Sequence, residues 1–203
     1  DFAWLSAPVY LDNRKHTNLV ATPLYLGRPY DRSYLIVPAS DLVTKSLLDL
    51  KGKVFAYVDP ASNTGHLESK NQLRLGNENP DHFFHKTFYT RDHQKIVAAV
   101  AIGLADGGAM SGFAWETLAP TRPDITAQTR IAAKSAEYGF PPIVARSTLN
   151  KKVLTRVQRV LHDMPTDPEG IALLKRFNLD GFALPDANLY KSVFQMMQRE
   201  DEQ

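Results

Sequence analysis

The residues best suited to chemistry form one short polar run, Asp59-Pro60-Ala61-Ser62-Asn63-Thr64-Gly65, between an apolar segment and a helix-like one. The first N–H groups of a helix have no intrahelical partner and lie at the positive end of its dipole. Two hydroxyls, an amide and a glycine at such a turn can surround an anion, and an oxyanion is the expected ligand. The alternative is that Ser62 or Thr64 only caps the following helix, as such residues commonly do.

Four histidines, His66, His82, His85 and His93, fall close together, and the middle two have a spacing that could place both imidazoles on one helical face. A zinc site needs further ligands. Without a cysteine or a convincing carboxylate partner, we expect surface or capping histidines and no bound metal. His93 differs because it opens a helix. Its ring could face the same crevice as the polar run if both helices begin at the ends of adjacent strands.

The usual signatures of enzymes are missing from the sequence. The run Gly108-Ala109-Met110-Ser111-Gly112 is not a nucleophile elbow, because Ala109 stands where that motif has glycine. Neither the dinucleotide-binding fingerprint nor the P-loop pattern occurs. Aromatic side chains such as Tyr10 and Trp115 could line a pocket, but aromatic residues near strands more commonly belong to a core. We therefore predict a protein that is not an enzyme and holds no cofactor.

The composition is that of an ordinary globular protein. The 203 residues are 43% hydrophobic and 23% charged, and 24 Lys and Arg against 22 Asp and Glu give a net charge of +2. Because the charges are interspersed, no polybasic surface is indicated and no nucleic-acid partner is expected. The lack of cysteine excludes disulfides and thiolate metal sites.

Two segments bear on membrane insertion and export. Residues 96–115 are apolar enough to suggest a membrane span, but Asp106 and several glycines interrupt them, so we expect a buried helix, a turn and a strand. The opening Asp1-Phe2-Ala3-Trp4-Leu5 has neither a basic n-region nor an apolar h-region. We expect the chain to begin inside a fold, with any export signal removed or upstream.

Predicted strands and helices alternate along the chain. Residues 53–59 are β-branched and aromatic and predict a buried strand that leads into the polar run and then a helix at 66–75. Two extended segments, 18–26 and 33–38, flank a Gly-Arg-Pro turn and predict an antiparallel pair. Further strands are expected at 2–5, 109–114, 125–133 and 141–147, although 125–133 could instead be helical. Further helices are expected at 42–50, from about 92 to 104, at 150–162, and after Asp167 and Pro185. This alternation predicts an α/β fold.

A further set of motifs follows in a fixed order along the chain. It includes Asp49-Leu50-Lys51-Gly52-Lys53, the segment from Phe55 through Gly65, and His93 ahead of Val97-Ala98-Ala99-Val100. Gly103 through Ala109 and the late run Gly181-Phe182-Ala183-Leu184-Pro185 complete it. In this order the motifs resemble the phosphonate- and phosphite-type periplasmic substrate-binding proteins of ABC transporters, and the likeness covers nearly the whole chain.

The resemblance implies a type II periplasmic-binding fold with two α/β lobes, two crossovers and a ligand cleft between them. Lobe one would hold residues 1–38 and 128–203, and lobe two residues 39–127. Members carry a strand–helix–strand stretch before the position of Asp1, which leaves room for an incomplete first lobe. The resemblance also implies a periplasmic or extracytoplasmic location, a small oxyanion of the phosphonate, phosphite or phosphate class as ligand, and an ABC permease as partner.

Individual residues can be carried over from the family's motifs. The loop Ser62-Asn63-Thr64-Gly65 matches the loop that grips the oxyanion, His93 matches a histidine at a helix start, and Tyr10 matches a tyrosine that faces the cleft. Asn63 stands where the family has a hydroxyl residue. Ser111 stands where transporter members usually have an aspartate that accepts a proton from the ligand. These departures leave the identity of the anion open.

Two other roles stay open at this point. The same module occurs as the sensing part of membrane histidine kinases and related receptors, and Ser111-Gly112-Phe113-Ala114-Trp115-Glu116 is somewhat closer to that branch. The two roles share the binding step and differ in the partner that detects closure, a permease or a sensor kinase module. The third alternative is an interaction scaffold that binds no ligand.

Overall fold

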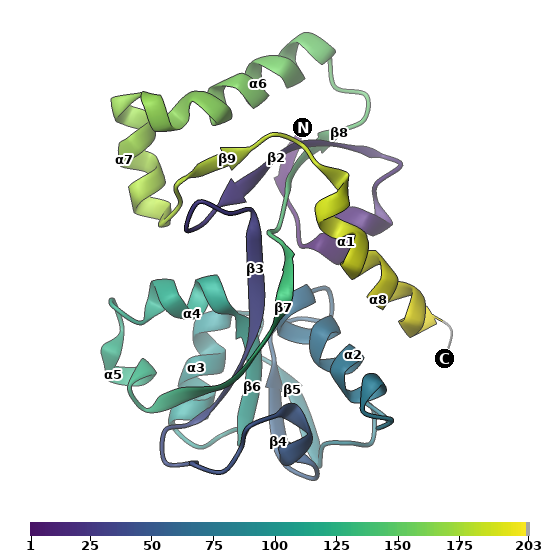
Figure 1. Cartoon of the computed structure of the whole chain (residues 1–203), viewed down its shortest axis with the longest axis vertical. Coiled ribbons are helices and arrows are strands. Elements are labelled where there is room, and N and C mark those ends of the chain that lie inside the picture. Colours follow the sequence, from purple (N-terminus) through teal and green to yellow (C-terminus); the bar gives the residue numbers. More distant parts are fainter. Residues whose placement is uncertain (202–203) are drawn as a thin grey trace. The chain divides into compact units, whose positions relative to one another are not determined.

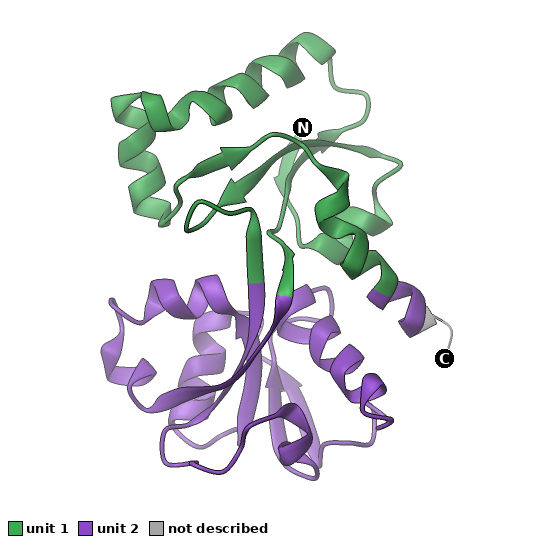
Figure 2. Ribbon diagram, viewed as in Figure 1, with its two compact units in different colours: residues 1–31, 137–195 green, residues 32–136, 196–203 purple. Residues whose placement is uncertain are grey.

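The computed structural model describes residues 1–201, which form two compact units (Figures 1 and 2). Unit 1 consists of residues 1–31 and 137–195, and unit 2 of residues 32–136 with the described residues from 196 onward. Strands β3 (Tyr30–Pro38) and β7 (Thr129–Gly139) both run across a unit boundary. The expected lobe boundaries at 38/39 and 127/128 fall at the ends of these same two strands, and the division into lobes stays a prediction.

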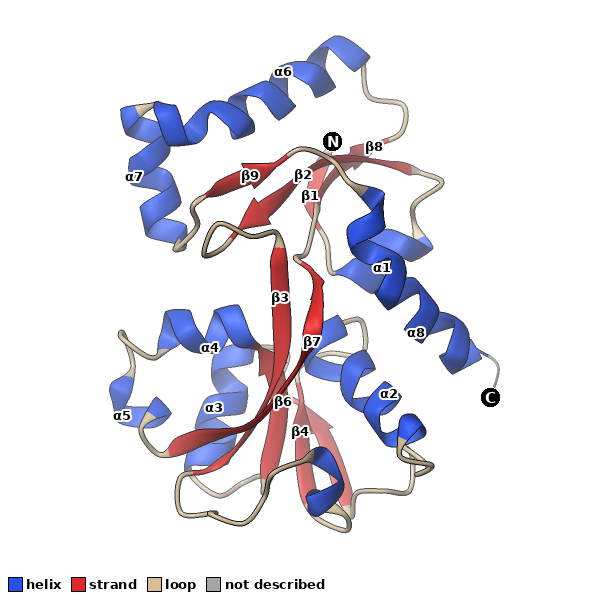
Figure 3. Cartoon of the chain, viewed as in Figure 1, coloured by secondary structure: helices blue, strands red, loops and turns tan. Residues whose placement is uncertain are grey.

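Unit 1 is built on a four-stranded antiparallel sheet in the order β1-β8-β2-β9. Its centre is the fully buried Tyr190, whose hydroxyl lies 2.9 Å from Thr22 Oγ1 and donates to the Phe140 carbonyl at 3.0 Å. The elements of this unit, coloured by type in Figure 3, are the strands β1 (Phe2–Trp4), β2 (Thr17–Leu24), β8 (Ile143–Arg146) and β9 (Gly181–Ala183), and the helices α1 (Ala7–Asp12), α6 (Lys151–Asp163), η3 (Met164–Thr166), α7 (Pro168–Phe177), η4 (Ala187–Tyr190) and most of α8 (Lys191–Asp201).

Unit 2 is built on a five-stranded mixed sheet in the order β5-β4-β6-β3-β7. Strand β4 pairs with β5 and with β6 in parallel, whereas β3 pairs with β6 in antiparallel fashion. Besides β3 and β7, its elements are η1 (Leu47–Leu50), β4 (Val54–Tyr57), the π-helical turn η2 (Asn63–Leu67), α2 (Glu68–Leu75), β5 (Lys86–Tyr89), α3 (His93–Ala101), β6 (Gly107–Ser111), α4 (Gly112–Leu118) and α5 (Pro123–Thr126).

The central strands β4 and β6 and residues 34–37 of β3 are buried on both faces of the unit 2 sheet, which explains why these stretches are largely apolar. Alternate residues of a strand point to opposite faces. Accordingly, Ile36 and Ala56 pack in one cluster with Val97 of α3, whereas Val37 and Phe55 pack in another with Leu73 of α2. The two helices therefore cover opposite faces and begin beside the same edge of the sheet.

The α/β class predicted from the sequence is confirmed, but the predicted pairing of the segments 18–26 and 33–38 is wrong. The expected turn is present, with Tyr25 and Arg28 joined by main-chain hydrogen bonds and Leu26 and Gly27 at positive φ. The strands on either side do not pair with each other. β2 pairs with β8 and β9, and β3 pairs with β6, so the turn connects two different sheets.

Several predicted boundaries also differ from the structure. The expected helix at 42–50 shrinks to η1, which a capping box of Ser46 and Asp49 starts at Leu47, although the Asp41 carboxylate accepts hydrogen bonds from the Val43 and Thr44 main chain as a cap would. The strand expected to reach 114 ends at Ser111, where α4 begins. The segment expected as a strand from 125 contains α5 first, and β7 begins at 129. Strand β1 exists, but Phe2 and Trp4 are exposed rather than buried.

Within the described part of the chain, no helix is both long and apolar enough to cross a membrane. The apolar segment from 96 to 115 contains the expected helix (most of α3), turn and strand (β6), and ends in the start of α4, which was not expected.

Candidate ligand-binding site

Three of the predicted ligand-binding segments lie at one edge of the unit 2 sheet. β4, β5 and β6 are parallel, so their carboxyl ends meet at the same edge. The polar run follows β4, the residues leading to His93 follow β5, and Ser111 is the last residue of β6. The turn η2 and the helix α3 both pack against β6. Ligands of open α/β sheets commonly bind at such an edge.

The polar run folds into a capped wide turn. Ser62 Oγ accepts a hydrogen bond from the Gly65 N–H at 3.0 Å, and the Ser62 carbonyl accepts from the Leu67 N–H at 3.0 Å. A Cβ atom at Gly65 would lie 2.5 Å from Val58 Cγ2, so only glycine fits there. The capping role considered for Ser62 is therefore real. A hydroxyl that accepts one hydrogen bond still has its own proton to donate.

Asn63 and Thr64 occupy the start of this turn and are both buried. Asn63 Oδ1 is enclosed and has no hydrogen-bond partner among the described residues. The Thr64 carbonyl accepts a hydrogen bond of 2.6 Å from the Ser33 hydroxyl on β3. Because Ser33 is paired in register with Ser111 on β6, this bond ties the turn to the neighbouring strand end.

His93 is tied to the same strand end. Asp92 caps α3 by accepting from the Gln94 N–H, and His93 Nδ1 accepts a hydrogen bond from the Ser111 N–H at 3.1 Å. Burial lowers the pKa of His93 to about 4, and the neighbouring Asp92 carboxylate opposes this only in part. At neutral pH the ring is therefore uncharged. Since Nδ1 accepts, the proton lies on Nε2, which can donate to an anion.

Ser111 joins a strand to a helix. It is buried, and its Oγ accepts a hydrogen bond from the Ala114 N–H at 3.1 Å, which caps α4. Its main-chain N–H is the group that binds His93. The structure thus brings Ser111 and His93 into direct contact through the main chain.

Tyr10 lies in unit 1, whereas the other predicted ligand-binding residues all lie in unit 2. It is buried on α1, and its ring packs edge-on against Tyr190 at a centroid distance of 5.1 Å. Burial raises the pKa of the Tyr10 hydroxyl, with an opposing effect of Arg14. Within its own unit, Tyr10 is a core residue with a neutral hydroxyl.

Sequence reasoning missed the residues that connect these segments. Arg91 forms an ion pair with Asp59, and its N–H donates to the Val58 carbonyl at 2.8 Å, so the loops after β4 and β5 are joined. Ser33 supports Thr64 from β3. No local pattern could have identified Ser33, because its role depends on a strand pairing that the sequence did not predict. Among the described residues, no group of three or more His, Asp and Glu side chains is placed to hold a metal ion.

The fold is shared with several solved structures. The chain is similar to PhnD1 from Prochlorococcus marinus in complex with methylphosphonate, with 19% identity and a TM-score of 0.87 over 100% of this chain and 79% of that one. It is similar to a binding protein component of an ABC phosphonate transporter from Pseudomonas aeruginosa, with 23% identity, a TM-score of 0.85, and coverage of 99% and 70%. It is also similar to XAC2383 from Xanthomonas citri bound to chloride, with 21% identity and a TM-score of 0.80 over 100% of this chain and 78% of that one.

A family model also matches nearly the whole chain. The model describes the periplasmic substrate-binding protein of an ABC phosphonate transporter, and it matches residues 1–190. The structures above have the type II periplasmic-binding fold that the sequence motifs implied. The chain belongs to the family of phosphonate-type periplasmic substrate-binding proteins of ABC transporters and has their α/β fold.

Proposed function

We propose that this chain binds a small oxyanion of the phosphonate, phosphite or phosphate class at the unit 2 sheet edge formed by Ser62–Gly65, His93 and Ser111. The observation that carries the proposal is the convergence of a capped turn and a neutral, oriented histidine on the end of β6. Each supplies hydrogen-bond donors of the kind an oxyanion accepts. The family match to phosphonate-binding proteins supports the same ligand class.

The solved structures of relatives support an anionic ligand. That of PhnD1 contains methylphosphonate, and those of XAC2383 contain chloride or ATP. For this chain the substitutions at two family positions bear on which anion is bound. Asn63 adds an amide in place of a hydroxyl, and Ser111 supplies a hydroxyl in place of a carboxylate. We infer a site that accepts anions in more than one protonation state.

We further propose that binding proceeds without turnover. On this proposal the chain acts in the periplasm or elsewhere outside the cytoplasm and passes its ligand to an ABC permease. The contact between Ser111 and His93 runs from a main-chain N–H to Nδ1, so the imidazole is not placed as a base on the Ser111 hydroxyl. The sensor-kinase role stays a prediction from the sequence. It shares the binding step, and the genes that neighbour this one would distinguish a permease partner from a kinase partner.

Isothermal titration calorimetry against a panel of anions tests the proposal directly. We expect heat of binding for at least one of phosphate, phosphite, methylphosphonate and 2-aminoethylphosphonate, with sulfate and small carboxylates as comparisons. Incubation with the bound ligand should leave it chemically unchanged by phosphorus NMR. Flat traces for all members of the panel would contradict the proposal and leave the scaffold alternative.

The Thr64 hydroxyl provides a second test. A hydrogen bond from a hydroxyl to a charged oxyanion contributes roughly 1.5–3 kcal/mol, so Thr64→Val should weaken binding about 10- to 150-fold. Thr64 is a cleaner choice than Ser62, whose hydroxyl also caps the turn. Thr87→Val, the same change on the exposed face of β5, is the matched control. Equal losses of affinity and unfolding free energy in Thr64→Val would instead indicate a purely structural threonine.

The low pKa of His93 predicts how stability depends on pH. Unfolded His93 takes up a proton near pH 6.5, whereas folded His93 does so only near pH 4. Acidification therefore favours the unfolded state across this window, by up to about 3 kcal/mol. Chemical denaturation at pH 7 and pH 4.5 should show a smaller acid loss in His93→Asn than in the wild type, whereas exposed His16→Asn should behave as the wild type. The same loss in all three proteins would contradict the assigned protonation state.

Ser111 tests how the site treats a proton on the ligand. Aspartate caps helices as well as serine does, so Ser111→Asp should keep α4 capped and the fold intact. The new carboxylate should repel sulfate, which carries no proton near neutral pH, more than phosphate, which can supply one. Over pH 6 to 8, we expect the phosphate-to-sulfate affinity ratio to be higher in Ser111→Asp than in the wild type, most of all at pH 6, where phosphate carries more of its protons. An unchanged ratio would mean that Ser111 only ends β6 and does not contact the ligand.

A further inference from the structure

One of the four histidines that fall close together in the sequence, His66, is buried for a reason that the proposed site does not give. It is only 7% exposed and belongs to η2, directly after the proposed anion-binding residues. His82 and His85 are exposed, as expected, and His93 already belongs to the site. The expectation of a surface residue is therefore wrong for His66, and its burial needs another explanation.

The hydrogen bonds of His66 determine which ring nitrogen carries the proton. Nδ1 lies 3.0 Å from the Pro60 carbonyl oxygen, and because a carbonyl only accepts, Nδ1 must carry a proton and donate it. Burial lowers the pKa of the His66 ring, Lys70 acts in the same direction, and the bond to the Pro60 carbonyl opposes. The ring is therefore neutral near pH 7, and Nε2 accepts the hydrogen bond from the Tyr89 hydroxyl 3.1 Å away. This is the tautomer opposite to that of His93.

The bond from His66 to Pro60 closes the loop that contains the proposed anion-binding turn. Pro60 precedes Ser62–Gly65 and His66 follows it, so the bond joins the two ends of the loop. A main-chain bond from the Val58 N–H to the Gly65 carbonyl, 3.0 Å long, closes the same loop at its base. Because proline has no N–H, its carbonyl is the main-chain group through which this end of the loop can be held.

The bond from Tyr89 to His66 joins this loop to the strand that leads to the other part of the site. Tyr89 is the last residue of β5 and is paired in register with Tyr57 of β4. The His66 ring packs edge-on against both tyrosine rings, with centroid distances of 4.9 Å to Tyr57 and 5.6 Å to Tyr89. From Tyr89 the chain runs directly into the short loop that ends at His93. His66 therefore links the turn after β4 to the end of β5.

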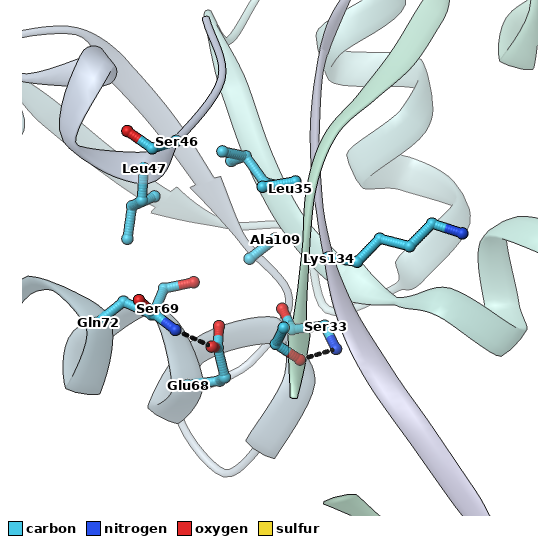
Figure 4. A pocket seen from close by; sticks show the side chains of 11 residues that line it. Ser33, Leu35, Ser46, Leu47, Glu68, Ser69, Gln72, Ala109 and Lys134 are labelled. Atoms are coloured by element: carbon cyan, nitrogen blue, oxygen red, sulfur yellow. Dashed lines mark hydrogen bonds between the residues drawn. The ribbon is translucent and has the colours of Figure 1, made fainter. Parts of the chain in front are cut away.

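Hydrogen bonds matter for this turn because packing at the start of α2 is incomplete. Figure 4 shows a cavity of about 130 Å³ that is lined in part by Glu68 of α2 and Ser33 of β3. Side chains beside a void lack part of their van der Waals contacts. Ser33 holds the Thr64 carbonyl from β3, and His66 holds the turn from β5. Since β3 and β5 lie on opposite sides of β4 in the sheet, the turn is held from both sides.

We propose that His66, as its Nδ1–H tautomer, is a positioning residue that holds the anion-binding turn between the Pro60 carbonyl and the end of β5. The inference rests on the proposed function for its effect on affinity. The tautomer and the held turn are properties of the free protein, so both can be measured without any ligand.

The first measurement determines the tautomer. Long-range proton–nitrogen correlation spectra at pH 7 distinguish a ring nitrogen that carries a proton from one that does not. The signals that disappear in His66→Asn belong to His66. We expect a protonated Nδ1 and an unprotonated Nε2 for His66, and the reverse for His93. A His66 ring with a proton on Nε2 alone, or on both nitrogens, would overturn the inference.

The second measurement separates the hydrogen bonds of His66 from the space that its ring fills. Phenylalanine keeps an aromatic ring and removes both nitrogens, whereas asparagine removes the ring and keeps an N–H donor at the δ position. We expect amide exchange at Gly65 and Leu67 to accelerate about two- to ten-fold in His66→Phe, the effect of one net hydrogen bond, and to stay closer to the wild type in His66→Asn. Wild-type exchange in His66→Phe, or the reverse order of the two variants, would mean that the ring only fills space and would overturn the inference.

The third measurement concerns the ligand. By calorimetry we expect His66→Phe to bind methylphosphonate about two- to ten-fold more weakly than the wild type, and His66→Asn to recover part of this loss. If the wild type binds no member of the anion panel, the proposed function fails, whereas the tautomer and the exchange rates still decide whether His66 holds the turn. Wild-type affinity in a His66→Phe variant whose turn exchanges faster would overturn the positioning role.

Tyr89→Phe keeps the inference testable if the His66 variants do not fold. Tyr89 is 41% exposed, and this change removes only the hydroxyl that donates to Nε2. We expect faster exchange in the turn and weaker methylphosphonate binding, both within the same two- to ten-fold range, and neither change in the control Tyr30→Phe of unit 1. Exchange rates and affinity of the wild type in Tyr89→Phe would overturn the link from the turn to β5.

Discussion

The parallel pairing of β4 with β5 and β6 is the constraint on which the rest of unit 2 depends. Parallel neighbours need a crossover, and the two crossovers here carry α2 over one face of the sheet and α3 over the other. Each strand consequently ends at the same edge. The turn after β4, the histidine after β5 and the serine that ends β6 come from separate parts of the sequence, and the sheet alone brings them together.

How much of this the sequence could predict depended on the range of the interaction involved. Ser62 as a cap and the apolar strand at β4 follow from local patterns, and the structure has both. The pairing of β3 with β6 depends on contacts between distant residues, so its partner was predicted wrongly. Ser33 escaped notice for the same reason, because its role depends on the Thr64 carbonyl that the fold places beside it.

The proposed anion site contains no charged side chain. The imidazole of His93 is neutral because of its burial, and the exposed Asp59–Arg91 pair nearby cancels its own charge. Attraction for an anion must therefore come from oriented N–H and O–H groups and the ends of helices. Such groups are fixed before the ligand arrives and discriminate by geometry.

The division of the chain also has a consequence for the order in which the protein folds. Residues 32–136 of unit 2 form one continuous stretch, whereas the sheet of unit 1 joins β1 and β2 to β8 and β9 from the far end of the chain. During synthesis, the β8 and β9 partners of β1 and β2 appear only after more than a hundred further residues, and pairings between such distant segments form slowly. Unit 2 can complete its sheet first. The exposed edges of β1 and β2 are the part of the nascent chain most open to wrong pairing, and they would benefit most from a chaperone.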